Sequence, residues 1–245
     1  MTETQSTETL AAWETSSQYW NKHQALIEEM YAPLSLALVT DAGVHSGDSV
    51  LDIGGGSGEP SLTVARAVGP SGSVAYTDPA AGMVNAARAA ADSKSLHNIQ
   101  FHQCGAESLP FPDNSFDAAV SRLSSMFFSE PLRAVSEILR VLKPGKKVAF
   151  LVWAPRDSNP FFSVVSEVLD RFVPSEPEPE DAPAAFRFAR ADKLAAILRQ
   201  AGAVSVSERL MRFSIEADIG LTPVRALSFD CGCPNADSAK IHASR

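Results

Sequence analysis

A glycine-rich stretch, VLDIGGGSGEP at residues 50–60, has the residue types and spacing of a ligand-binding turn. An apolar segment ends at these glycines, and a helix-like segment, SLTVARAV, follows them. We expect backbone N–H groups and the positive end of that helix to meet at this turn, where glycine lets a ligand lie against bare backbone. The stretch therefore predicts an anion-receptive corner at the carboxyl edge of a sheet.

The spacing of the glycines separates the possible ligand classes. A dinucleotide-binding turn has the pattern G-x-G-x-x-G, but the third position here is Glu59, whose carboxylate would repel a pyrophosphate. A P-loop would need a Lys-Ser or Lys-Thr pair, and none follows. The pattern present is D-x-G-x-G-x-G, with Asp52 followed by Gly54, Gly56 and Gly58. It matches neither phosphate-binding motif.

A second acidic residue, Asp78, ends the next strand-like segment, SVAYTD. In a nucleotide-binding sheet this is the usual position of an acid that accepts hydrogen bonds from both ribose hydroxyls. Asp78 also precedes Pro79 and a helix-like segment, so it could instead cap that helix. The glycine turn favours the ribose role.

Strand-like and helix-like segments alternate through the middle of the chain. The strand-like segments are SVLDI, SVAYTD, NIQFHQCG, FDAAVSRLSS and VAFLVW, the last following a turn at KPGKK. This alternation predicts an α/β fold, a doubly wound, Rossmann-like, mostly parallel sheet with helices on both faces. We expect residues 43–155 to form this core.

The flanking segments are expected to cover the core. Residues 1–42 predict a helical cap after a disordered start to about residue 8, and its aromatic residues either pack in the core or form a lid over a ligand. Residues 156–215 predict helices and one edge strand, VSVSERLMRFSI, and residues 216–245 predict an irregular tail. The tail offers no evident partner for that strand, so the sheet edge is either incomplete or covered in a homodimer.

Four segments together resemble the class I S-adenosylmethionine-dependent methyltransferases. They are VLDIGGGSGEPSLTVA, AYTDPAAGMVNAAR, GAESLPFPDNSFDAAVSR and EILRVLKPGKKVAFLVW. The resemblance is closest to the branch with the ubiquinone and menaquinone biosynthesis C-methyltransferases and many small-molecule methyltransferases. It implies the methyltransferase fold, S-adenosylmethionine as cofactor, and methyl transfer to a small-molecule acceptor by in-line displacement. Two alternatives remain, a protein of this fold that binds without transferring methyl, and a nicotinamide-dependent oxidoreductase.

The resemblance also implies roles for individual residues. Asp52 would order the glycine turn and favour the cofactor's positive charges, and Asp78 would bind its ribose. The family often has an aspartate for the adenine amine where this chain has Gly105, so the adenine would rest near Ala106 or on Glu107. The residues implied at the cofactor are Asp52, Gly54, Gly56, Gly58, Asp78, Pro79, Met83, Ala106, Glu107 and Ser121.

The sequence singles out no general base, because methyl transfer from a sulfonium depends mainly on alignment and exclusion of water. His23 and Arg122 are catalytic candidates by residue type and position. Arg122 would orient an acidic or carbonyl-bearing substrate, unless it is an outward surface arginine. The residues expected to line the substrate pocket are Trp13, Tyr19, Trp20 and Arg122.

Charge and composition limit the partners. The net charge of -8 and the pI near 5.1 argue against nucleic acid. The amino terminus lacks the features of a signal peptide, and the longest apolar run, Val148 to Ala154, is too short to span a bilayer, so we expect a cytoplasmic protein with no membrane partner. Cys231, Cys233 and His242 match no common zinc spacing, so no metal is expected.

Overall fold

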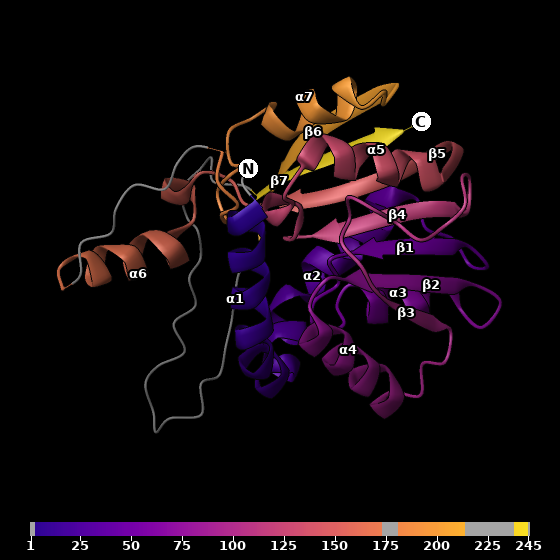
Figure 1. The fold of residues 1–245 in the computed structure, drawn as a ribbon, viewed down its shortest axis with the longest axis horizontal. Helices are drawn as coiled ribbons and strands as arrows, with labels where there is room; N and C mark the ends of the chain where they lie inside the picture. Colours follow the sequence, from indigo (N-terminus) through magenta and orange to yellow (C-terminus); the bar gives the residue numbers. More distant parts are fainter. Residues whose placement is uncertain (1–2, 173–180, 214–237, 245) are drawn as a thin grey trace.

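The computed structural model describes residues 3–172, 181–213 and 238–244, in which one seven-stranded sheet has the order β3-β2-β1-β4-β5-β7-β6 (Figure 1). The pairs from β3 to β5 are parallel, and β7 is antiparallel to β5 and to β6. The predicted doubly wound, mostly parallel sheet is confirmed. The strands are β1 (Ser49–Ile53), β2 (Ser73–Asp78), β3 (Ile99–Gln103), β4 (Phe116–Arg122), β5 (Leu142–Val152), β6 (Ser205–Met211) and β7 (Ser238–Ser244).

Helices cover both faces of the sheet because side chains alternate along each strand and leave an apolar surface on either side. One face packs against α2 (Gln24–Ala42), α3 (Ser61–Val68) and α4 (Ala81–Ser93). The other packs against α5 (Pro131–Val141) and α7 (Lys193–Gln200). Short 3-10 turns follow two strands, η1 (Ser125–Phe127) after β4 and η2 (Arg156–Ser158) after β5.

Two further helices lie outside these layers. The amino-terminal α1 (Glu3–Lys22) stands beside the carboxyl ends of the parallel strands and packs on α4, whereas α6 (Pro160–Asp170) projects away from the rest of the molecule (Figure 1). The sequence predicts a helical segment from Leu10 to about Val39 after a disordered start, and the disordered start is wrong. The helix begins at Glu3, and it breaks at His23 into α1 and α2. One straight helix could not pack on both α4 and the sheet.

The expected irregular tail, residues 216–245, is wrong for residues 238–244, which form β7, whereas residues 216–237 and 245 lie outside the described residues. β7 lies between β5 and β6 and pairs with both along its whole length. Its sequence, SAKIHAS, has little β propensity, so the strand depends on hydrogen bonds to two neighbours. The KPGKK turn forms an irregularity within β5. Across it β5 advances from Leu142 to Lys147, whereas its partner strand β4 advances only from Phe116 to Ala118.

The strand order reverses next to β1. From β1 the chain moves outward to β2 and β3, then returns to place β4 on the other side of β1. At such a reversal the connections leave β1 and β4 in opposite directions, which opens a crevice at the carboxyl ends of the strands. The glycine turn after β1 lies at this crevice.

Burial of α2 on the sheet predicts a large stability effect from one leucine and not from its near neighbour. Leu34 is 0% exposed and Leu36 is 60% exposed. We expect Leu34→Ala to lower the free energy of unfolding by about 2–5 kcal/mol and Leu36→Ala to change it by no more than about 0.5 kcal/mol. Urea unfolding followed by circular dichroism measures both. Equal effects would mean that α2 does not pack on the sheet as described.

Candidate functional site

The loop after β1 has the backbone that its glycines predict. Gly54, Gly56 and Gly58 have φ angles of 67°, 53° and 124°, a region that disfavours other residues. Gly55, which the sequence analysis did not single out, is required for a different reason. A Cβ there would lie 2.5 Å from the Tyr76 ring and 2.7 Å from Oδ2 of Asp52. A Cβ on Gly56 would meet nothing within 4 Å, so bare backbone faces open space at that residue.

The N–H groups of this loop are used within the protein. Those of Gly54 and Gly55 donate to the carbonyl oxygen of Thr77, and that of Gly58 donates to the carbonyl oxygen of Gly55. The N–H of Gly56 donates to Asp78. These four glycine N–H groups therefore hold the loop in place, and the anion-receptive corner expected together with the start of α3 stays a prediction.

Asp52 is a fully buried acid at the end of β1. Its Oδ2 accepts a hydrogen bond of 2.6 Å from the hydroxyl of Ser61, the first residue of α3, and its Oδ1 has no partner among the described residues. Desolvation raises the pKa of Asp52 to about 7, although the Ser61 bond and the charge of Arg122 act in the opposite direction. A buried carboxyl oxygen without a partner suits a ligand that carries positive charge.

Asp78 ties the loop to β2 and to α4. Its Oδ2 accepts from the N–H of Gly56 at 3.0 Å, and its Oδ1 accepts from the N–H of Ala80 at 2.9 Å. The capping alternative from the sequence therefore describes part of its role. Each oxygen keeps a second lone pair, so these bonds do not preclude a ribose contact. Burial raises the pKa of Asp78 to about 6, and the two backbone bonds act against the shift.

Tyr76 and Ser124 complete the support of the loop, and neither was predicted to act there. The buried Tyr76 hydroxyl donates to the carbonyl oxygen of Gly56 at 2.6 Å. The Ser124 hydroxyl, just after β4, donates to the carbonyl oxygen of Ile53 at 2.8 Å and lies 2.8 Å from the hydroxyl of Ser121. Residues of β2 and residues at or just after the end of β4 thus hold the loop that follows β1 between them. The only sequence signal for these residues is their place at strand ends.

Comparison with known proteins agrees with this geometry. Residues 51–150 match the family described as methyltransferase domain. A ubiquinone/menaquinone biosynthesis C-methyltransferase of Hahella chejuensis is 38% identical over 131 residues, which are 53% of this chain and 52% of that protein. The chain thus spans about half the length of the curated relatives that it matches.

Residues 51–150 are thus similar to a methyltransferase domain. Solved structures agree on the fold. A SAM-dependent methyltransferase from Aquifex aeolicus has a TM-score of 0.56 at 23% identity and covers 85% of this chain and 88% of its own. The cyclase SpnF has a TM-score of 0.57 at 24% identity, with 80% of this chain and 74% of its own covered. The resemblance inferred from the four sequence segments is confirmed.

The segment after β3 has a structural role that the sequence did not reveal. Ala106 is buried, and Oε1 of Glu107 accepts hydrogen bonds from the N–H and hydroxyl of Ser129 and from the N–H of Glu130. Glu107 therefore caps the start of α5, where a negative charge is favourable. Its role at adenine stays a prediction, as do those of Pro79, which is exposed, and Met83, which is buried in α4.

The helix α1 brings some of its aromatic residues to the segment after β4. Trp13 packs edge-on against Phe127 of η1 with ring centroids 5.0 Å apart, and its centroid lies 6.0 Å from that of Trp20. Nearby, the carboxylate of Glu14 accepts hydrogen bonds from the N–H of Gly82, at the start of α4. Tyr19, in contrast, is 65% exposed, so a place in the pocket is not supported for it by burial.

His23 and Arg122 differ in how firmly neighbouring residues hold their side chains. His23 lies at the break between α1 and α2, where its ring packs on Tyr19. Among the described residues its side chain has no hydrogen-bond partner, so nothing orients it as a base. Arg122 is not an outward surface arginine. It is partly buried, donates to the hydroxyl of the fully buried Ser35, and lies over the ring of Tyr31.

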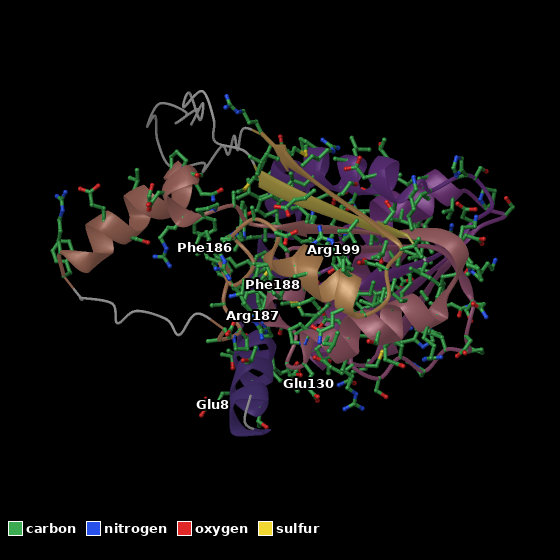
Figure 2. The ribbon with its side chains drawn as sticks, turned by 90° about the horizontal axis from the view of Figure 1, so that it is seen from above. Glu8, Glu130, Phe186, Arg187, Phe188 and Arg199 are labelled. Atoms are coloured by element: carbon green, nitrogen blue, oxygen red, sulfur yellow. The ribbon has the colours of Figure 1, made fainter. Side chains whose placement is uncertain are left out.

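A second aromatic group, not predicted from the sequence, adjoins Arg122 through Tyr31. The ring of Trp153, after β5, lies 6.3 Å from that of Tyr31, 6.2 Å from that of Phe213 and 4.9 Å from that of Phe162. Phe162 in turn packs on Phe186, in the segment that leads to α7. Figure 2 shows Phe186, Arg187 and Phe188 in this segment, and Arg187 donates to the carbonyl oxygen of Phe128 beyond η1.

The expectations of no metal site and no membrane-spanning segment can be compared only with the described residues. Within the described residues, no cluster of three or more His, Cys, Asp or Glu residues could hold a metal ion, and Cys231 and Cys233 lie outside those residues. No helix in the described ranges is long and apolar enough to cross a membrane.

The two buried acids predict how stability depends on pH. Their pKa values, about 7 for Asp52 and about 6 for Asp78, exceed those of an unfolded chain, so the folded state holds the protons more tightly. Their contribution is present at low pH and is lost as the pH rises from about 4 through about 7. We expect Asp52→Asn to reduce this loss by roughly 1–3 kcal/mol in urea unfolding between pH 5 and pH 8.

Asp92→Asn, on the exposed side of α4, is the control for removing one carboxylate. If Asp52→Asn and the wild type lost stability in parallel over this range, the Asp52 carboxyl would not be the desolvated group described.

Proposed function

We propose that this chain is an S-adenosylmethionine-dependent methyltransferase that acts on a small-molecule acceptor. The observation that carries the proposal is the hydrogen bond from Gly56 to Asp78, since it joins an acid-flanked glycine loop to the acid at the end of the neighbouring strand. A ligand with a ribose and a positively charged end would meet both acids there. The match of residues 51–150 to the methyltransferase domain supports the same cofactor.

The residues present fit this cofactor in two respects. Oδ1 of Asp52 is buried without a partner among the described residues, which suits the cofactor's positive charges. Gly56 leaves its backbone open, whereas the loop lacks the free glycine N–H groups that a pyrophosphate would need. Asp52 would hold the ammonium of the amino-acid end, which would lie against Gly54, Gly56 and Gly58 without using their N–H groups. Asp78 would bind the ribose, with Ser121 beside the sulfur. The adenine would be held by Pro79, Met83, Ala106 and Glu107.

When bound, the cofactor supplies a methyl group on a sulfonium, which is electrophilic without help from the protein. The protein's part is then to align the acceptor and to exclude water. Trp13 of α1 packs on Phe127, which follows β4, and Tyr31 of α2 lies near Trp153, which follows β5, so both pairs adjoin the carboxyl ends of parallel strands. These apolar rings favour an acceptor with an apolar body.

A protein of this fold that binds a ligand without methyl transfer is the second candidate. Two observations favour it, namely Gly105 at the position where the family often has an adenine-binding aspartate, and structural similarity to a cyclase. Both candidates share the cofactor site, so a binding experiment tests the site before the chemistry. A cytoplasmic location and a homodimer stay predictions.

Calorimetric titration with S-adenosylmethionine, S-adenosylhomocysteine and NADH tests the proposed site. We expect the first two ligands to bind and NADH not to bind. Asp78→Asn should weaken the binding of S-adenosylmethionine and of S-adenosylhomocysteine by about tenfold or more, because a hydrogen bond to a charged group contributes about 1.5–3 kcal/mol. Asp92→Asn is the matched control on the exposed side of α4. A folded wild-type protein that binds neither ligand would refute the proposal.

A further inference from the structure

Arg122 is a charged residue at the crevice to which the proposed function gives no task. Its guanidinium donates one hydrogen bond of 3.0 Å to the Ser35 hydroxyl and lies 5.4 Å from the centroid of the Tyr31 ring. No carboxylate of the described residues lies within the 4.0 Å of an ion pair with it. An arginine has five N–H donors, so in the part of the chain that the structure describes most of them remain available.

The surroundings of Arg122 disfavour an uncompensated charge. Ser35 is fully buried, and desolvation lowers the pKa of Arg122 from its usual value. Taking a charge out of water costs several kcal/mol unless hydrogen bonds and an opposite charge offset it. The acids Asp52 and Glu59 act on Arg122 from beyond ion-pair distance and offset only part of this cost. The arrangement is more favourable with an anion in contact with the guanidinium.

The charges nearby limit which anion this is. Asp52 and Glu59 would repel a highly charged group, so one negative charge fits better than a phosphate. A carboxylate also matches the planar fork of an arginine, to which it binds with two parallel hydrogen bonds. The four loop glycines cannot serve instead, since the N–H groups of Gly54, Gly55, Gly56 and Gly58 already have partners.

We propose that Arg122 binds a carboxylate, held against α2 by Ser35 and Tyr31. This assignment rests on the proposed function, because the carboxylate has two sources there. One is the amino-acid end of the cofactor, for which Asp52 offers the complementary negative group. The other is the methyl acceptor, whose apolar body would lie along the aromatic group that begins at Tyr31 and continues to Trp153 and Phe213.

Paired ligands distinguish the two sources by calorimetric titration. S-adenosylhomocysteine and 5′-methylthioadenosine share the adenosine and the thioether sulfur, but only the first has a carboxylate. Benzoate and benzamide, titrated into both the free and the S-adenosylhomocysteine-saturated protein, differ in the same way as probes of an acceptor. The proteins are the wild type, Arg122→Met and the control Arg88→Met, since the exposed Arg88 also contacts an aromatic ring, that of Phe101, at 4.9 Å.

We expect Arg122→Met to weaken the binding of one carboxylate ligand by about tenfold or more. The binding of the paired ligand that lacks the carboxylate should weaken by less than about twofold. Loss for S-adenosylhomocysteine but not 5′-methylthioadenosine assigns the cofactor, and loss for benzoate but not benzamide assigns the acceptor. Arg88→Met should bind all four ligands as the wild type does. If Arg122→Met does not fold, Arg122→Lys keeps the charge, loses the fork, and is expected to weaken the same ligand.

Unchanged binding of S-adenosylhomocysteine together with no Arg122-dependent binding of benzoate would overturn the proposal and leave Arg122 as a link between β4 and α2. A wild type that binds no S-adenosylhomocysteine would instead refute the proposed function. In that case the benzoate titration of the free protein still decides whether Arg122 binds a carboxylate.

Discussion

Gly56 is held at both of its backbone groups by β2, and the crevice depends on this double attachment. Its N–H donates to Asp78 and its carbonyl oxygen accepts from Tyr76, two residues that lie at the end of one strand. Without them a loop of consecutive glycines would have a large entropy to lose on ordering. With them the loop is drawn over β2, and the acid expected at a ribose is placed beside the glycine that faces open space.

The same attachment explains why two carboxyl groups are tolerated in a buried place. The burial of Asp78 is offset by hydrogen bonds from two backbone N–H groups. That of Asp52 is offset by the hydrogen bond from the Ser61 hydroxyl and by the positive charge of Arg122. Desolvation nevertheless raises the pKa of both acids. Natural proteins keep such unfavourable groups mainly where a ligand needs them. The crevice therefore combines two acids and one arginine, a set that complements a ligand with charges of both signs.

The two amino-terminal helices are part of this arrangement, and each is anchored at one point, α1 through Glu14 and α2 through Gln24. Glu14 accepts from the N–H of Gly82 at the start of α4, and the side chain of Gln24 donates to the carbonyl oxygen of Ser57 in the glycine loop. α1 packs closely against α4, since a Cβ on Gly82 of α4 would collide with Ser17 of α1. The break at His23 lets α1 follow α4 while α2 follows the sheet.

The sequence by itself determined the features that depend on neighbours along the chain. Alternating strand and helix patterns fixed β1 to β5 and their helices, the glycines fixed the positive φ angles of the loop, and Asp78 followed from its place at the end of β2. The tertiary structure alone decided which distant residues meet. Arg122 turns toward Ser35, 87 residues away, Glu107 caps α5, and β7 forms between two strands despite its weak propensity. Local periodicity carries no information about such contacts, because they arise only when packing brings separate elements to the same edge of the sheet.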